Sequence, residues 1–183
     1  MKQKIPKLIL PAISVMALSL TLNIRAANEL QVQSEQTIAD FKSADPEIKS
    51  FFENAAGYAV FPDVGKGGFI VGGARGKGLL YEKGIATGQA TMTQASIGAQ
   101  AGGQSFAQII FFETPGAVSD FKSGKFELGA DVSAVAVSQG AAQSAKYKQG
   151  VAVFAKPKKG LMVQASVGGQ KFKFEPLITP TGP

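Results

Sequence analysis

The sequence predicts a mainly β fold: an antiparallel sandwich or irregular barrel of about eight to ten strands, with two N-terminal helices and one short internal helix. Short β-prone runs separated by glycine or proline recur between residues 58 and 174. Apolar residues at helical spacing occupy residues 29–54, and a second helical segment follows at residues 115–122. Because no crossover helices separate the strands, an all-parallel α/β sheet is excluded.

The beginning of the chain has the three parts of a secretory signal peptide. Three lysines within the first seven residues precede an apolar stretch at 8–22, and Ala26-Ala27 follows it. A membrane anchor is the alternative, but the apolar stretch is shorter than the roughly 20 residues that span a bilayer, and it contains Pro11. We therefore expect residues 1–26 to be removed, which would leave a protein that is periplasmic or secreted.

The remaining residues, 27–183, have the length of a single domain. The domain core is expected at about residues 35–175. The tail at 176–183 contains three prolines and is expected to be loosely held.

Charge and missing residue types exclude several functions. Residues 1–25 carry four of the 19 Lys and Arg and none of the 13 Asp and Glu, so the rest of the chain carries 15 minus 13, or +2. Nucleic acid is therefore not an expected partner. The chain has no histidine and no cysteine, which removes the commonest general base, the usual transition-metal ligands and a lipidated cysteine. We predict no enzyme activity, no metal and no cofactor.

Two helices are expected within residues 29–54, meeting at Ser43-Ala44. Asp45 before Pro46 is a good start for the second helix, because its side chain can accept hydrogen bonds from unpaired amides while proline fits the first turn. The Phe51-Phe52 pair either packs on the sheet or inserts into a membrane. The neighbouring glutamates weaken attraction to anionic lipid, so packing on the sheet is the favoured interpretation.

The strands are expected at residues 58–61, 69–71, 79–81, 86–101, 106–112, 126–136, 151–155, 161–167 and 172–174. Pro62 is expected to stop the first of them. A change of apolar phase in the fourth predicts a bulge or turn near Thr93-Gln94. The alternation at 126–136 is the cleanest in the chain, whereas 138–149 is expected to be a loop or a weak strand. The short helix should begin after Thr114 and end at Ser123-Gly124.

Glycine is concentrated between residues 55 and 78, which hold eight of the chain's 22 glycines. Glycine supplies positive φ angles and lets another backbone or a ligand approach, so this stretch is either a binding loop or a tightly turned corner of the sheet. It does not match a P-loop, because Val71 stands where the first glycine is required and Gly78 follows Lys77. A dinucleotide fingerprint would need glycine or alanine in place of Ile70. Nucleotide binding is therefore disfavoured.

The same stretch resembles the signature of the SYLF-domain family. The matching motifs, which extend the resemblance over roughly residues 35–175, are AGYAVFP at 56–62, GGF at 67–69, GGARGKG at 72–78, SIGAQAGGQ at 96–104 and FKSGKFELG at 121–129, with a last match near Gly160-Leu161. The SYLF domain is a lipid-binding domain found in bacteria and eukaryotes, and its eukaryotic members are linked to phosphoinositide membranes and to actin regulation. The resemblance implies lipid binding, while actin is an unlikely partner for an exported chain.

We therefore expect a non-catalytic phospholipid-binding protein of the bacterial cell envelope. The alternative is a structural or protein-interaction module of the periplasm without a specific lipid ligand. The expected lipid-binding residues are Lys66, Gly67, Gly68, Arg75, Gly76 and Lys77.

A second basic group consists of Lys156, Lys158, Lys159, Lys171 and Lys173. Either group could be an ordinary solvated hairpin end. Cations beside amides that glycine leaves accessible would suit an anionic phospholipid or a membrane surface.

Overall fold

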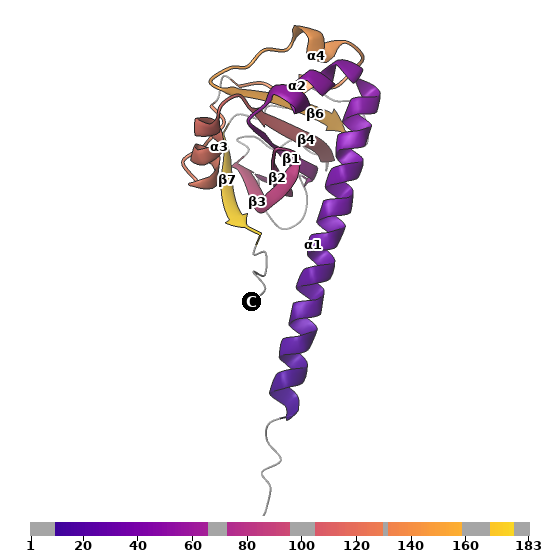
Figure 1. Cartoon of the computed structure of the whole chain (residues 1–183), viewed down its shortest axis with the longest axis vertical. Helices are drawn as coiled ribbons and strands as arrows, with labels where there is room; N and C mark the ends of the chain where they lie inside the picture. The colour runs from indigo at the N-terminus through magenta and orange to yellow at the C-terminus, as the bar shows by residue number, and fades with distance from the viewer. Residues whose placement is uncertain (1–9, 66–72, 96–104, 130–131, 159–168, 178–183) are drawn as a thin grey trace, which may run out of the picture.

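Figure 1 shows the computed structural model of the chain, which describes residues 10–65, 73–95, 105–129, 132–158 and 169–177, with side chains in the first helix described from residue 26. The elements in chain order are α1 (Leu10–Ala44), η1 (Pro46–Ile48), α2 (Lys49–Asn54), β1 (Gly57–Gly65), β2 (Gly73–Glu82), β3 (Ile85–Ala95), β4 (Ser105–Phe112), α3 (Pro115–Lys122), β5 (Val135–Ala136), α4 (Ala141–Ser144), β6 (Val151–Pro157) and β7 (Gln170–Pro176).

The seven strands form one sheet in the order β5-β6-β4-β1-β2-β3-β7. Neighbouring strands are antiparallel except β5 and β6, which are parallel. The sheet is strongly curled: Gln108 on β4 hydrogen-bonds to Gln170 on β7, although three strands separate β4 from β7 in the sheet order. The predicted mainly β class is confirmed, in the form of one curled sheet that does not close into a barrel.

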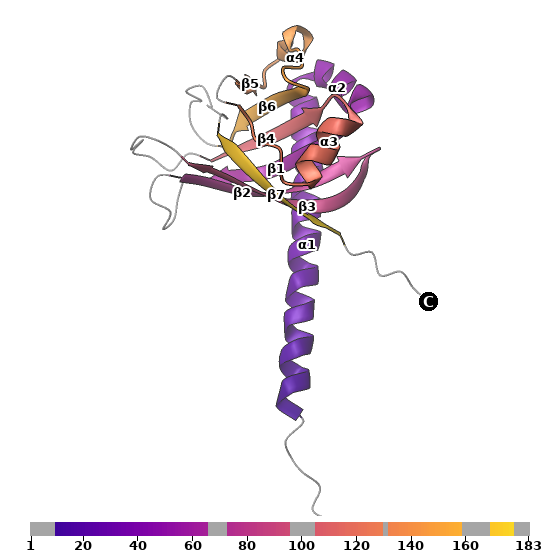
Figure 2. The ribbon, with the colours of Figure 1, turned by 90° about the vertical axis from the view of Figure 1, so that its left-hand side faces the viewer.

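Each face of the sheet has its own apolar cluster. We call the face that carries α1, α2 and α4 the outer face, and its cluster includes Phe41, Phe51, Phe111 and Phe154. The inner face packs against α3 and against aromatic side chains such as Phe172 on β7. Figures 1 and 2 show α1 crossing the outer face and continuing well past the sheet, while α3 lies on the opposite side. No helix in the described part of the chain is both long and apolar enough to span a membrane.

The N-terminal helices break where the sequence predicts. α1 ends at Ala44, although it begins at Leu10 and so covers more of the chain than expected. Asp45 caps the next helix by accepting a hydrogen bond from the Glu47 N–H, and the first turn there is a 3-10 helix with Pro46 at its start. Packing of the phenylalanine pair on the sheet is confirmed: the ring centroids of Phe51 and Phe52 lie 5.5 and 4.8 Å from that of Phe111.

Pro62 does not end β1, contrary to expectation. The strand continues to Gly65, and its register with β2 shifts between Val60 and Asp63. A bulge leaves one residue unpaired, so a residue that has no N–H can be accommodated there.

The bulge or turn predicted near Thr93-Gln94 is absent from the described residues, where β3 continues to Ala95. Pairing of β2 with β3 is regular there, and the register shifts instead at Leu80 and Tyr81. The even phase of Ala90 and Met92 continues in the buried side chain of Gln94, while the odd-phased apolar residues after Ala95 lie outside the described residues.

The segment at 126–136 has the clearest alternation in the sequence but is not a continuous strand. Within the described residues it contributes a bridge from Glu127 to Lys171 on β7 and the short strand β5 beside β6. These are the two opposite margins of the curled sheet, so the segment runs from one to the other. Leu128 and Val132 are buried in the inner cluster. Alternate burial is therefore present, but among the described residues of this segment only Glu127, Ser133 and β5 take part in a bridge or strand.

The other expected elements agree with the structure or lie outside the described residues. β4, β6 and β7 correspond to the strands predicted at 106–112, 151–155 and 172–174, and α3 is capped by Thr114 and ends at Ser123. The segment at 138–149, expected to be a loop or a weak strand, instead contains the one-turn helix α4. The strands expected at 69–71 and 161–167, and the end of that expected at 86–101, fall outside the described residues.

Candidate functional site

Two of the predicted lipid-binding cations lie on the outer face of β2. Arg75 and Lys77 are both exposed and alternate with buried residues, as the pleat of a strand requires. Leu79 and Tyr81 continue the same side of the strand but belong to the apolar cluster beneath α1. The helix therefore covers one half of this face and leaves the cation-bearing half open to solvent.

Two lysines of the second basic group join them. In the sheet, β3 lies between β2 and β7, and paired residues on neighbouring strands project from the same face. The register forms two rows across these strands, Arg75–Thr93–Lys171 and Lys77–Thr91–Lys173. We call Arg75, Lys77, Lys171 and Lys173 the cationic face. Its charges are spaced about 10 Å apart across the strands and about 7 Å apart along them.

The lysines on β7 have carboxylate partners. Lys171 Nζ lies 3.1 Å from Glu127 Oε1, and Lys173 Nζ lies 2.7 Å from Glu175 Oε1, although both lysine side chains are more than 70% exposed. The hydrogen bond and the charge of Lys173 lower the pKa of Glu175. Arg75 and Lys77 form no salt bridge with any residue that the structure describes. Four cations and two carboxylates leave this surface with a net charge of +2.

The glycines of β2 have a packing role. A Cβ added to Gly76 would lie 2.9 Å from Val64 Cγ2, and one added to Gly78 would lie 2.3 Å from the Val60 carbonyl oxygen. Gly76 is buried and faces the interior between the two exposed cations. Here the glycines let β1 and β2 approach closely, as expected for a sheet corner. The predicted site residues Lys66, Gly67 and Gly68 lie outside the described residues.

The remaining lysines of the second group are placed differently. Lys156 Nζ donates a 3.3 Å hydrogen bond to the Asp40 carbonyl oxygen, where a cation is favourable near the C-terminal end of α1. Lys158 forms a 3.0 Å ion pair with Asp63 on β1, close to the cationic face. Lys159 lies outside the described residues.

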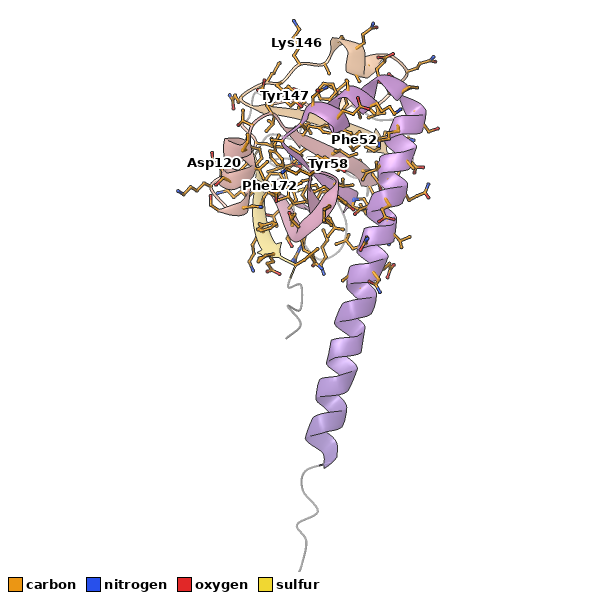
Figure 3. All side chains as sticks on the ribbon, viewed as in Figure 1. Phe52, Tyr58, Asp120, Lys146, Tyr147 and Phe172 are labelled. Atoms are coloured by element: carbon orange, nitrogen blue, oxygen red, sulfur yellow. The ribbon has the colours of Figure 1, made fainter. Side chains whose placement is uncertain are left out.

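A shallow groove of about 620 Å³, which the sequence does not predict, lies between α2 and the segment at 142–147. Phe51 and Tyr147 line it with ring centroids 5.4 Å apart, and Glu47, Glu113 and Lys146 contribute charges. Lys146 projects outward, whereas Tyr147 lies nearer the sheet (Figure 3). Burial, and to a lesser extent Glu113, raises the pKa of Tyr147. The groove was missed because its walls come from distant segments.

Chemically, the cationic face offers positive charges and threonine hydroxyl groups, whereas the groove offers charges, hydroxyl groups and aromatic rings. Among the residues that the structure describes, no three acidic, histidine or cysteine side chains are grouped so that they could hold a metal ion. The fold and its most charged open surface thus define a mainly β protein with a cationic sheet face.

Comparison with known proteins finds similarity to one family. Residues 93–176 match the model of the family described as Ysc84, Las17-binding protein actin regulator. The chain is also 30% identical over 168 residues to beta cell expansion factor A of Aeromonas veronii, which covers 87% of this chain and 63% of that protein. Residues 93–176 are thus similar to the Ysc84 (SYLF) family, the family that the motifs resemble.

The matches cover only part of the proteins that are compared. The chain spans less than two thirds of the length of the Aeromonas relative. The family model covers the end of β3 and every element from β4 to β7, but it does not include Arg75 or Lys77. This similarity supports a lipid-binding or actin-related module, and neither printed name describes an enzyme.

Proposed function

We propose that this protein is a non-catalytic phospholipid-binding protein of the bacterial cell envelope, and that it attaches to anionic bilayers through the cationic face. One observation carries the proposal: β3 brings together two basic groups that are almost 100 residues apart in sequence. Arg75 and Lys77 share an open sheet face with Lys171 and Lys173. The location in the envelope rests on the signal-peptide prediction.

The energetics suit reversible attachment. Each cation near an anionic membrane surface contributes on the order of 1 kcal/mol, and this attraction decreases within a Debye length. Arg75 and Lys77 are available without loss of an ion pair to a described residue, whereas Lys171 and Lys173 must exchange carboxylates for phosphates. Thr91 and Thr93, between the cations, can donate hydroxyl hydrogen bonds to the same oxygens. Binding should therefore be salt-sensitive.

A second candidate function is a protein-interaction module of the periplasm without a specific lipid ligand. The groove between α2 and the segment at 142–147 favours it, because aromatic rings there lie beside both signs of charge. Interfaces are enriched in such aromatic side chains. Actin is not the proposed partner, because an exported chain would not meet it.

Vesicle flotation tests the leading proposal. Full-length protein carrying Arg75→Gln and Lys77→Gln should bind anionic vesicles about tenfold or more weakly than the wild type, because two cations are lost. Its thermal transition should stay within a few degrees of the wild type, since exposed charges contribute little to stability. The matched control is Lys49→Gln with Lys146→Gln, which removes the same charge from exposed sites near the groove.

Two outcomes would contradict the proposal. One is equal binding of the wild type and the folded Arg75→Gln/Lys77→Gln variant. The other is an equal loss of binding in the Lys49→Gln/Lys146→Gln control, which would show that only total charge matters. Vesicles of neutral lipid separate two modes of binding. Attraction to surface charge is lost on them, whereas binding at a specific lipid site is retained.

A further inference from the structure

We infer that three buried glutamines, Gln94, Gln108 and Gln170, fix the register of β7 and thereby place Lys171 and Lys173 in the cationic face. This inference rests on the proposed function only where it concerns lipid. The placement of β7 itself can be tested without a membrane.

The glutamines come from three strands and meet on the inner face. Gln108 Nε2 on β4 donates to Gln170 Oε1 at 2.8 Å, and Gln170 Nε2 donates back to Gln108 Oε1 at 3.1 Å. Gln170 Nε2 also lies 3.5 Å from Gln94 Oε1, its register partner on β3. Gln108 and Gln170 are fully buried, and Gln94 is 8% exposed. The Gln108–Gln170 pair therefore joins two strands across the interior of the curled sheet.

The apolar pattern of β7 does not determine its register. The strand alternates inner residues Gln170, Phe172 and Phe174 with outer residues Lys171, Lys173 and Glu175. A shift by one residue would turn the lysines inward, so burial of the phenylalanines opposes it. A shift by two residues keeps every aromatic side chain on the inner face. The alternation of apolar and polar residues therefore does not exclude such a shift, although the shift would move the Phe174 ring away from Gly88, whose missing side chain makes room for it.

A shift by two would change the charge of the outer face. If Lys173 moved opposite Thr93, Glu175 would move opposite Thr91. The two β7 positions of the face would then carry one lysine and one glutamate in place of two lysines. The native register is thus the one that gives these positions the higher positive charge.

The glutamine network distinguishes the native register of β7 from the register shifted by two residues. In the shifted register, Phe172 would replace Gln170 opposite Gln94, and the amide of Gln108 would lose both of its hydrogen bonds to Gln170. Burying an amide group without a partner is costly. A single buried polar contact can specify register in this way even where apolar residues would be as stable. The network therefore acts as a positioning device for the lysines of β7.

Disulfide trapping tests the register directly, because the natural chain has no cysteine. Thr93→Cys with Lys171→Cys reports the native register, since these residues lie directly opposite each other. Thr93→Cys with Lys173→Cys reports the shifted register; in the native register this diagonal pair is roughly 7–8 Å apart, beyond the usual reach of a disulfide. Each pair is compared in the natural background and in Gln108→Leu/Gln170→Leu.

In the natural background, only the native pair should oxidise. In Gln108→Leu/Gln170→Leu, the shifted pair should oxidise to an amount comparable with the native pair. Replacing both partners avoids leaving one of them unpaired, so this variant should fold, whereas Gln108→Leu alone should be less stable. Gln139→Leu, at an exposed position, is the matched control and should behave as the natural chain. Exclusive native cross-linking in folded Gln108→Leu/Gln170→Leu would overturn the inference.

Binding to anionic vesicles then links register to function. Gln108→Leu/Gln170→Leu, without added cysteines, should bind several-fold to tenfold more weakly, because the shifted molecules exchange a lysine for a glutamate in the face. Unchanged vesicle binding despite a shifted register would contradict the role of β7 in the proposed function while leaving the register assignment intact. A native register in the cross-linking experiment contradicts the inference whatever the lipid result.

Discussion

The side-chain carboxylate of Asp45 accepts a 2.7 Å hydrogen bond from the backbone N–H of Ala142, almost 100 residues further along the chain. Its other oxygen accepts from the N–H groups of Glu47 and Gly140. Asp45 is 1% exposed, so these three donors replace the water that a carboxylate normally requires. One buried side chain thus caps a helix and attaches α4 to the junction of α1 and α2.

Replacing Asp45 with alanine should lower the free energy of unfolding by about 3 kcal/mol. A helix cap contributes about 1 kcal/mol, and hydrogen bonds to a charged acceptor contribute about 1.5–3 kcal/mol each, with incomplete additivity. Urea unfolding measures the change. Asp120→Ala is the control, because its exposed carboxylate has no hydrogen bond to a described residue, and it should change stability by less than about 0.5 kcal/mol. A similar loss in both variants would contradict this role of Asp45.

Gly78→Ala should destabilise the protein by more than about 2 kcal/mol, because the new methyl group would overlap the Val60 carbonyl and the Phe61 ring. Gly116→Ala is the contrasting change. Its Cβ would meet nothing closer than 3.7 Å, and alanine is favoured over glycine in a helix such as α3. Thermal unfolding should give a large decrease in Tm for the first variant and none for the second. A Gly78→Ala protein as stable as the natural one would show that β1 and β2 can separate without cost.

Local signals made several elements predictable. The Asp45-Pro46 helix start, the Thr114-Pro115 start of α3 and the dense apolar run of β4 all depend on neighbouring residues, and all are present. The failures involve distant contacts. Gln94 is a polar residue that is buried because Gln170 lies beside it, and nothing near it in the sequence indicates this.

The candidate site was predictable in parts but not as a surface. Arg75 and Lys77 were identified from the glycine-rich stretch, and Lys171 and Lys173 from a separate basic group. Their meeting depends on β7 pairing with β3 rather than with the strand before it in sequence. Sequence spacing does not encode such a pairing, and the same holds for the groove beside Tyr147.

The stability contribution of Glu82 should depend on pH. Partial burial raises the pKa of this carboxyl group, but hydrogen bonds from Lys122 and Thr87 outweigh burial, so the pKa is lowered. A lowered folded-state pKa means that the stability contribution is present above the unfolded-state pKa and is lost as the pH falls through the lower folded-state pKa.

Glu82→Gln should therefore be less stable than the natural protein at pH 7, and the difference should become small near pH 3. Urea unfolding of both proteins at the two pH values measures it. Glu53→Gln, an exposed position on α2, should show little difference at either pH. A difference for Glu82→Gln that stays constant with pH would contradict the lowered pKa.

Removing the carboxylates beside the cationic face should strengthen membrane binding. Glu127 and Glu175 pair with Lys171 and Lys173, so Glu127→Gln/Glu175→Gln raises the net charge of this surface from +2 to +4. These ion pairs are largely exposed and contribute little to stability, so the fold should be retained. Affinity for anionic vesicles at low salt should rise about tenfold, and the gain should shrink as salt increases.

The control Glu47→Gln/Glu53→Gln changes the total charge equally on the exposed surface of η1 and α2 and should have a much smaller effect. Equal gains in the two double variants would mean that vesicles sense the charge of the whole protein, and would contradict binding through the face formed by β2, β3 and β7.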